Sequence, residues 1–133
     1  MYQITIVRTF CAAHAIRLGD GSWEPVHGHN WDVELTVAAD ELDGIETVMD
    51  FHKLGRIVDG PLERLHNRNL NEITPFASRG KQAGVNPTAE RVAWWLGSQV
   101  AKALPSNVRL EQVRVGEAPG CTAVFRPDPA GSG

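Results

Sequence analysis

The sequence predicts an α+β fold, in which an antiparallel four-stranded sheet carries two helices on one face. Apolar and polar residues alternate near both ends of the chain, which is typical of half-buried strands, whereas the middle has two stretches with apolar residues at helical spacing. The resulting order is β-β-α-α-β-β. Two hairpins and two amphipathic helices bury their apolar surfaces together when both helices pack on one face of the sheet.

The first hairpin is predicted from two runs rich in β-branched and aromatic residues, at residues 2–15 and 26–39. A Gly-Asp-Gly-Ser cluster at residues 19–22 marks a turn between them. In the first run Phe10 and His14 share one parity, so we expect them on the same face of the sheet. Antiparallel pairing would place the end of the first strand beside the start of the second.

The first helix is predicted to begin at about Asp50 and to carry an apolar stripe as far as Leu65. Gly60-Pro61 lies inside it and predicts a bend or a break, because proline lacks the N–H that a helix interior uses. Residues 66–84 are predicted to form a loop. A loop of this length is unusual for a simple connection, which indicates a functional or intersubunit role.

The second helix is predicted to begin at Asn86-Pro87, because asparagine is a favourable N-cap and proline loses nothing at the first helical position. Pro105 is expected to end it. Residues 108–118 and 121–126 then form the second predicted hairpin.

Size and composition indicate one globular domain and argue against several classes of partner. The chain has 133 residues, 42% of them hydrophobic and 22% charged, and we expect one domain at residues 1–126 with a flexible tail at 127–133. The net charge of −3 argues against nucleic acid. No apolar stretch approaches the roughly 18–20 residues of a membrane span. Two distant cysteines, Cys11 and Cys121, make no disulfide framework, so we expect a cytoplasmic protein.

Three histidines form the strongest candidate site. His27 and His29 flank a glycine at the start of a predicted strand, and residues two apart point to the same face. His14 ends the strand that pairs with it. A His-x-His pair alone is more often an ordinary feature of a strand, but the third histidine favours a metal. Three imidazoles leave one position open on a tetrahedral Zn²⁺, which is the pattern of a catalytic site.

Two glutamates are candidates for chemistry beside the histidines. Glu117 follows a glycine at the end of a predicted strand, and a carboxylate can accept two parallel N–H bonds from a guanidine-like ring edge. Glu24 precedes the His-Gly-His stretch by three residues, in a turn. Spacing alone favours an ordinary solvated acid at Glu117, and it leaves Glu24 open between a surface acid and a catalytic group.

Six short stretches, spread over nearly the whole chain, match the motifs of one enzyme family. They are Phe10-Cys11-Ala12-Ala13-His14, His27-Gly28-His29-Asn30-Trp31, Val48-Met49-Asp50-Phe51, Asn69-Leu70-Asn71, Asn86-Pro87-Thr88-Ala89-Glu90 and Val113-Arg114-Val115-Gly116-Glu117. With them the chain resembles the 6-pyruvoyl-tetrahydropterin synthase and 6-carboxytetrahydropterin synthase family. Together they are far more specific than any one of them.

The resemblance implies the tunnelling fold, whose β-β-α-α-β-β order matches the order above. It implies trimers whose sheets close into a barrel, two of them stacked into a hexamer, with active sites at the subunit interfaces. The zinc ligands carry over to His14, His27 and His29, and the glutamate that holds the pterin carries over to Glu117. The implied substrate is 7,8-dihydroneopterin triphosphate, whose side-chain hydroxyls bind the metal.

Two departures from the family pattern bear on the reaction. Trp23 stands where the family usually has its catalytic cysteine, and the family's Asp-His dyad corresponds to His66 and Asn67. A subgroup of the family has a glutamate just before the histidine motif, which resembles Glu24 here. In that subgroup the side chain is cleaved to give 6-hydroxymethyl-7,8-dihydropterin for folate synthesis. We therefore expect Glu24 to act as the base, with His66 supplying a second proton transfer.

Three alternatives remain open at this point. The first alternative is the activity of a 6-carboxytetrahydropterin synthase in a deazapurine (queuosine) route. The second is a relative that binds pterin or purine without catalysis. The third is a structural zinc barrel without a ligand. The loss of the cysteine favours cleavage to a hydroxymethyl product over a pyruvoyl or carboxy product.

Overall fold

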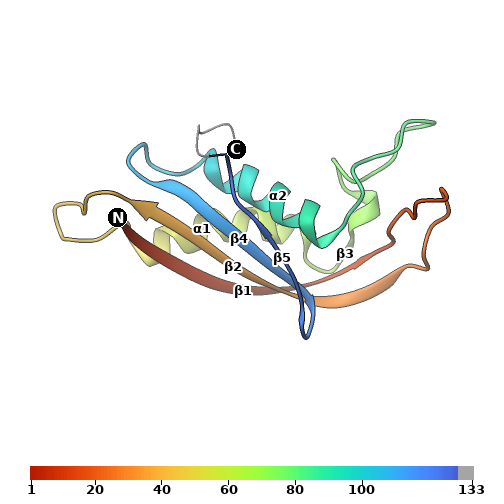
Figure 1. Cartoon of the computed structure of the whole chain (residues 1–133), viewed down its shortest axis with the longest axis horizontal. Helices are drawn as coiled ribbons and strands as arrows, with labels where there is room; N and C mark the ends of the chain where they lie inside the picture. The colour runs from red at the N-terminus through yellow and green to blue at the C-terminus, as the bar shows by residue number, and fades with distance from the viewer. Residues whose placement is uncertain (129–133) are drawn as a thin grey trace.

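A computed structural model describes residues 1–128, so the part of the predicted flexible tail at residues 129–133 lies outside the described residues. Figure 1 shows a twisted sheet with two helices packed along it. The elements in chain order are β1 (Tyr2–His14), β2 (His27–Ala39), α1 (Phe51–Leu65), β3 (Arg68–Asn69), a short 3-10 helix η1 (Leu70–Glu72), α2 (Ala89–Ala101), β4 (Arg109–Ala118) and β5 (Cys121–Phe125). The predicted α+β class and the order of the long elements are confirmed.

The sheet has the strand order β3-β1-β2-β4-β5. Its four long strands are antiparallel neighbours, as the sequence predicts. The fifth strand, β3, was not predicted: it comes from the expected loop after α1 and pairs in parallel with Ala12 and Ala13 of β1. Two residues are too short to carry a readable alternation, so its pairing depends on where tertiary packing places the chain after α1.

The core lies between the helices and one face of the sheet. Buried side chains tend to alternate with exposed ones along β1 and the first half of β2, whereas residues 35–39 of β2 are all buried. Phe10 stacks on Trp31 with the ring centroids 5.7 Å apart. The largest fully buried side chains include Trp31, Phe10, Phe76, Leu35, Leu54, Leu65, Leu70, Leu96 and His14. The presence of His14 in this set is unusual, because a polar ring buried among apolar residues needs partners.

In the part of the chain that is described, no helix is both long and apolar enough to cross a membrane.

The structure tests two expectations about the helices. The expected break at Gly60-Pro61 is absent, because helix α1 continues through it with buried residues, among them Val58 and Leu62, on both sides of the proline; the alternative, a bend, stays a prediction. Helix α2 is capped by Thr88 instead of Asn86: the Thr88 hydroxyl accepts a hydrogen bond from the Arg91 N–H at 3.1 Å. The Asn86 side chain makes other contacts, which are described below.

Candidate metal centre and adjoining pocket

The hairpin of β1 and β2 brings the three histidines together. His14 and His27 are direct partners in the strand register, and His29 lies two residues further along β2. The ring centroids are 4.7 Å apart for His14–His27 and His27–His29, and 5.2 Å apart for His14–His29. Glu117, near the end of β4, completes a group whose four ligand atoms all lie within 4.8 Å of one another. A group of this size and composition could hold one metal ion.

Backbone carbonyl groups orient two of the three imidazoles. His14 Nδ1 donates to the Pro87 carbonyl at 2.8 Å, and His27 Nδ1 donates to the Pro25 carbonyl at 2.8 Å. A carbonyl only accepts, so the proton sits on Nδ1 and the Nε2 lone pair of each ring is free for a ligand. Metal-binding histidines usually have such a partner on the second nitrogen.

The buried nitrogens of this group lack partners within residues 1–128. The Nε2 atoms of His14 and His29 are buried and make no hydrogen bond. Burial lowers the pKa of His14, against the hydrogen bond that its Nδ1 donates to the Pro87 carbonyl and the charge of Glu117, which raise it. The neutral imidazole is the form that binds a metal. The unpartnered nitrogens and the nitrogen-and-oxygen donor set therefore fit a zinc ion.

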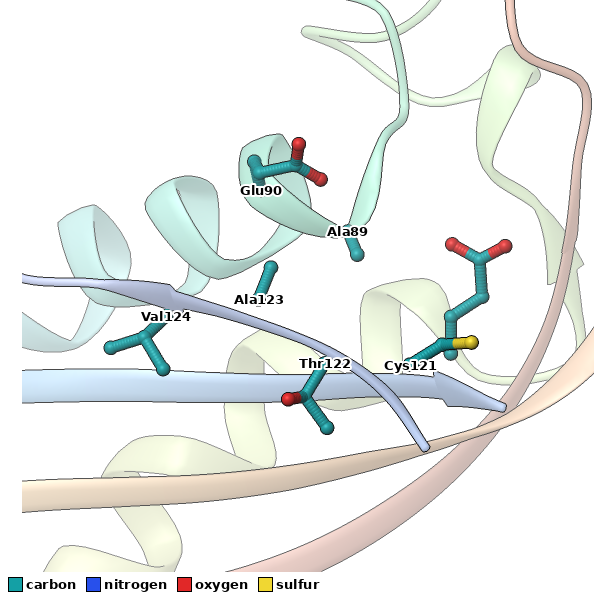
Figure 2. A pocket seen from close by; sticks show the side chains of 7 residues that line it. Ala89, Glu90, Cys121, Thr122, Ala123 and Val124 are labelled. Carbon is teal, nitrogen blue, oxygen red and sulfur yellow. The ribbon is translucent and has the colours of Figure 1, made fainter. Parts of the chain in front are cut away.

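Glu117 stands between the histidines and a cavity of about 410 Å³. Its Oε1 lies 3.2 Å from His29 Nε2 and 3.7 Å from His14 Nε2. Figure 2 shows the cavity between the start of α2 and β5. The lining residues are Ala89, Glu90, Glu117, Cys121, Thr122, Ala123 and Val124. Glu117 thus contacts both the candidate metal position and a space of the size that small ligands occupy.

The cavity contains two groups that sequence reasoning did not assign to a site. Glu90 comes from the first turn of α2, and Cys121 is the first residue of β5. Both lie far along the chain from the histidines, so no spacing rule links them to the site. Two carboxylates in one small cavity, Glu90 and Glu117, favour a ligand that presents several N–H donors.

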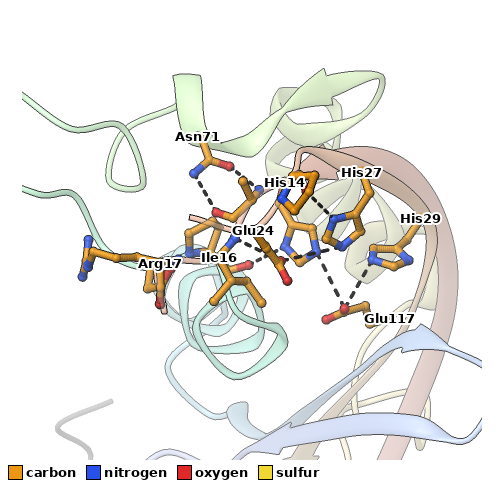
Figure 3. Close-up of polar contacts among 12 residues, drawn as sticks. His14, Ile16, Arg17, Glu24, His27, His29, Asn71 and Glu117 are labelled. Carbon is orange, nitrogen blue, oxygen red and sulfur yellow. Dashed lines mark hydrogen bonds and ion pairs between the residues drawn. The ribbon is translucent and has the colours of Figure 1, made fainter. Parts of the chain in front are cut away.

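Glu24 lies at the rim of the histidine group (Figure 3). Its Oε1 is 3.7 Å from His27 Nε2 and accepts a hydrogen bond from the Ile16 N–H at 3.0 Å. The Glu24 N–H in turn donates to the Ile16 carbonyl at 3.0 Å. The side chain of Glu24 is 28% exposed. The carboxylate is therefore held beside the candidate metal group and remains partly exposed.

His66 does not join this group. It caps the C-terminus of α1, and its Nδ1 accepts a hydrogen bond from the Cys11 N–H at 3.1 Å. The side chain of Cys11 lies on the opposite face of β1 from that of His14, because the two residues are three positions apart along the strand. The second proton transfer expected of His66 stays a prediction, and one chain alone does not place His66 beside the histidine cluster.

Comparisons with known proteins agree on one family. A model described as 6-pyruvoyl tetrahydropterin synthase matches residues 3–128. The chain is 37% identical over 109 residues to a protein of Pyrococcus furiosus named dihydroneopterin monophosphate aldolase, covering 82% of this chain and 83% of that one. It is 33% identical over 124 residues to the 6-carboxy-5,6,7,8-tetrahydropterin synthase of Bacillus subtilis, covering 90% and 82%.

The fold agrees with a solved structure. The 6-pyruvoyl tetrahydropterin synthase of Caenorhabditis elegans superposes with a TM-score of 0.76 at 21% identity, covering 96% of both chains. At this level of identity the likeness supports the arrangement of strands and helices alone.

Proposed function

Because the chain belongs to the 6-pyruvoyl tetrahydropterin synthase family, whose members are pterin lyases, we propose that it is a zinc-dependent lyase that cleaves the side chain of a phosphorylated 7,8-dihydroneopterin to give 6-hydroxymethyl-7,8-dihydropterin. The observation that carries the proposal is the position of Glu24, whose Oε1 lies 3.7 Å from the metal-facing nitrogen of His27. The 37% identical relative named as an aldolase supports the same reaction.

The proposed cleavage assigns one role to each part of the site. When bound by the three histidines, zinc would raise the acidity of a substrate hydroxyl that coordinates it. Glu24 takes the proton from the hydroxyl of the second side-chain carbon. That carbon becomes a carbonyl, the bond between the first and second side-chain carbons breaks, and the electron pair moves to the first carbon and the adjoining ring C=N bond. A proton then adds to the first carbon, and the phosphorylated two-carbon aldehyde leaves.

The cavity supports the binding half of the proposal. We propose that Glu117 accepts two N–H bonds from the guanidine-like edge of the pterin, which places the ring in the cavity and its side chain toward the histidines. His14, His27 and His29 then hold the metal at the other end of the ligand. In this arrangement Glu117 lies between the part of the site that binds the ring and the part that carries out the reaction.

The open edges of the sheet support the predicted trimer or hexamer. Within residues 1–128, only Ala12 and Ala13 on the outer side of β1 have a strand partner, and β5 has a partner strand on one side alone. Exposed strand edges favour association with another chain, and closure into a barrel removes them. We propose that these two edges pair between subunits.

Product analysis tests the reaction. The zinc-loaded protein is incubated separately with 7,8-dihydroneopterin triphosphate and with the monophosphate, and the products are identified by mass. We expect 6-hydroxymethyl-7,8-dihydropterin and a phosphorylated two-carbon aldehyde from at least one of them. A pyruvoyl product or a 6-carboxy product would support the corresponding synthase activity instead. Substrate that binds but stays intact would support the non-catalytic alternative.

A second prediction separates the two contacts of Glu117. Glu117→Gln is expected to weaken binding of neopterin by roughly 10- to 100-fold, because it removes the charge from a pair of hydrogen bonds to the ring. Zinc content is expected to change little, since three imidazoles remain. Fluorescence titration measures the first quantity and metal analysis the second. Glu90→Gln, in the same cavity, is the matched variant. Loss of zinc with unchanged neopterin affinity would make Glu117 a metal ligand and not the anchor.

A further inference from the structure

The segment that follows β1 belongs to none of the named strands among residues 1–128, and its one β-type pairing there is an isolated antiparallel bridge between Arg17 and Trp23. Residues 15–17 continue beyond His14, the last residue of β1. Asn71 accepts a hydrogen bond from the Ala15 N–H at 2.8 Å and donates to the Ala15 carbonyl at 2.9 Å. Asn86 does the same for Arg17, at 2.8 Å and 3.0 Å. Each side-chain amide thus pairs with both backbone groups of one residue, as a neighbouring strand would.

The residue between the two amide pairs holds Glu24. In an extended chain the backbone groups of successive residues point to opposite sides. Ile16 therefore faces away from the two asparagines, and its N–H and carbonyl bond the Glu24 carboxylate and the Glu24 N–H, both at 3.0 Å. Figure 3 shows Asn71 on one side of this segment and Glu24 on the other. The position of the carboxylate thus depends on a segment whose opposite edge is fixed by two side chains.

Both asparagines come from the long connection between α1 and α2. Asn71 lies in η1, and its own N–H is bonded by the Asn69 side chain at 3.0 Å. Asn86 is followed by Pro87, whose carbonyl bonds His14 Nδ1. One connection therefore contacts both a candidate metal ligand and the segment that carries the candidate base.

We propose that Asn71 and Asn86 are positioning residues that set the Glu24 carboxylate against the metal site by fixing residues 15–17. The inference rests on the proposed function only in that Glu24 is taken as the base. Neither asparagine reaches Glu24 directly, so each acts through the backbone of Ile16. A displacement of about 1 Å in a reacting group can lower the rate about 100-fold, so even a small shift of residues 15–17 would be measurable in kcat.

The test uses Asn71→Asp and Asn86→Asp, which keep the shape of the side chain but replace the N–H donor with an oxygen facing a carbonyl. Asn107→Asp, in an exposed loop, is the matched control. We expect kcat to fall roughly 10- to 100-fold in the first two variants, with KM within about threefold of wild type and with zinc content and melting temperature close to those of the control. If an aspartate variant fails to fold, Asn71→Ser and Asn86→Ser carry the same test without added charge.

A double-mutant cycle distinguishes positioning from general damage. In a Glu24→Gln background the asparagine variants are expected to cause no further loss of kcat, because the group that they position is already inactive. An equal further loss, or wild-type kcat in both single variants, would overturn the proposal.

A second readout needs no turnover. Hydrogen exchange of the peptide that contains residues 15–17 is expected to be slow in wild type and fast in both variants. Slow exchange in the variants would overturn the inference even if the protein is an active lyase. Fast exchange in the variants of a protein without lyase activity would support the role of the two asparagines in fixing residues 15–17, while contradicting the proposed reaction.

Discussion

Replacing His29 with alanine is expected to weaken zinc binding by more than about 100-fold and to abolish turnover. Loss of a partner in the outer shell of a zinc site typically costs 10- to 100-fold in affinity, and loss of a direct ligand costs more. His29 suits this test because its side chain is 20% exposed, whereas His14 is fully buried and also packs in the core. The buried Nε2 of His29 makes no hydrogen bond among residues 1–128, and it lies 3.2 Å from Glu117 Oε1. A loss of zinc affinity is therefore compared with the effect of Glu117→Gln, which changes that contact and keeps the three imidazoles.

Thermal unfolding with and without zinc measures this effect independently of activity. A ligand at 100 times its Kd stabilises the folded state by about 2.7 kcal/mol, which for a chain of this size raises the melting temperature by roughly 10 °C. We expect that rise in wild type and in His52→Ala, whose side chain is exposed on α1, and not in His29→Ala. Equal zinc-induced shifts in all three proteins would contradict a metal site at the histidines.

The long antiparallel strands could be predicted because each has a sequence signal of its own. Alternation of apolar and polar residues marks β1 and β2, and their pairing follows from one turn. The sequence was therefore enough to predict that His14 and His27 are neighbours. The register of that hairpin is what brings residues 13 positions apart into one metal group. Local patterns were thus enough to predict that the three histidines lie together, because all three belong to one hairpin.

The contacts made by the connection between α1 and α2 could not be predicted in the same way. Strand β3 and the asparagine bonds depend on where tertiary packing places residues 66–88, and no periodicity describes that. The N-cap illustrates the difficulty: Asn86 has the right chemistry for a cap, but its amide pairs with Arg17 and Thr88 takes the capping role. A side chain with several bonding options is assigned by its surroundings, which a single sequence does not contain.

The glutamates show the same division. Glu24 follows the turn of the first hairpin and precedes His27 by three residues, so it lies near His27 because the two are close in the sequence. Glu117 reaches the site through β4, which pairs with β2, and its approach to His29 depends on the register of that second pair. The motif that carries Glu117 singled out the residue, but the sheet register is needed to show that it lies beside the candidate metal group as well as in the cavity.

Glu24→Gln is expected to lower kcat about 100- to 10,000-fold while zinc content and pterin affinity stay near wild type, since positioned general bases contribute rate factors of this size. Glutamine keeps the shape of the side chain and an oxygen that can accept the Ile16 N–H, so the segment at residues 15–17 should keep its position. The charge and the proton acceptor are lost. Single-turnover formation of 6-hydroxymethyl-7,8-dihydropterin measures the chemical step without product release.

Two further variants make the assignment of the base specific. Glu63→Gln, on the exposed side of α1, makes the same chemical change away from the site and is expected to keep wild-type kcat. Cys121→Ser tests the thiol that lines the cavity beside Glu117. Full activity in Glu24→Gln together with inactivity in Cys121→Ser would contradict the proposal. Inactivity in Glu24→Gln with intact zinc and pterin binding would leave the carboxylate beside His27 as the group that starts the cleavage.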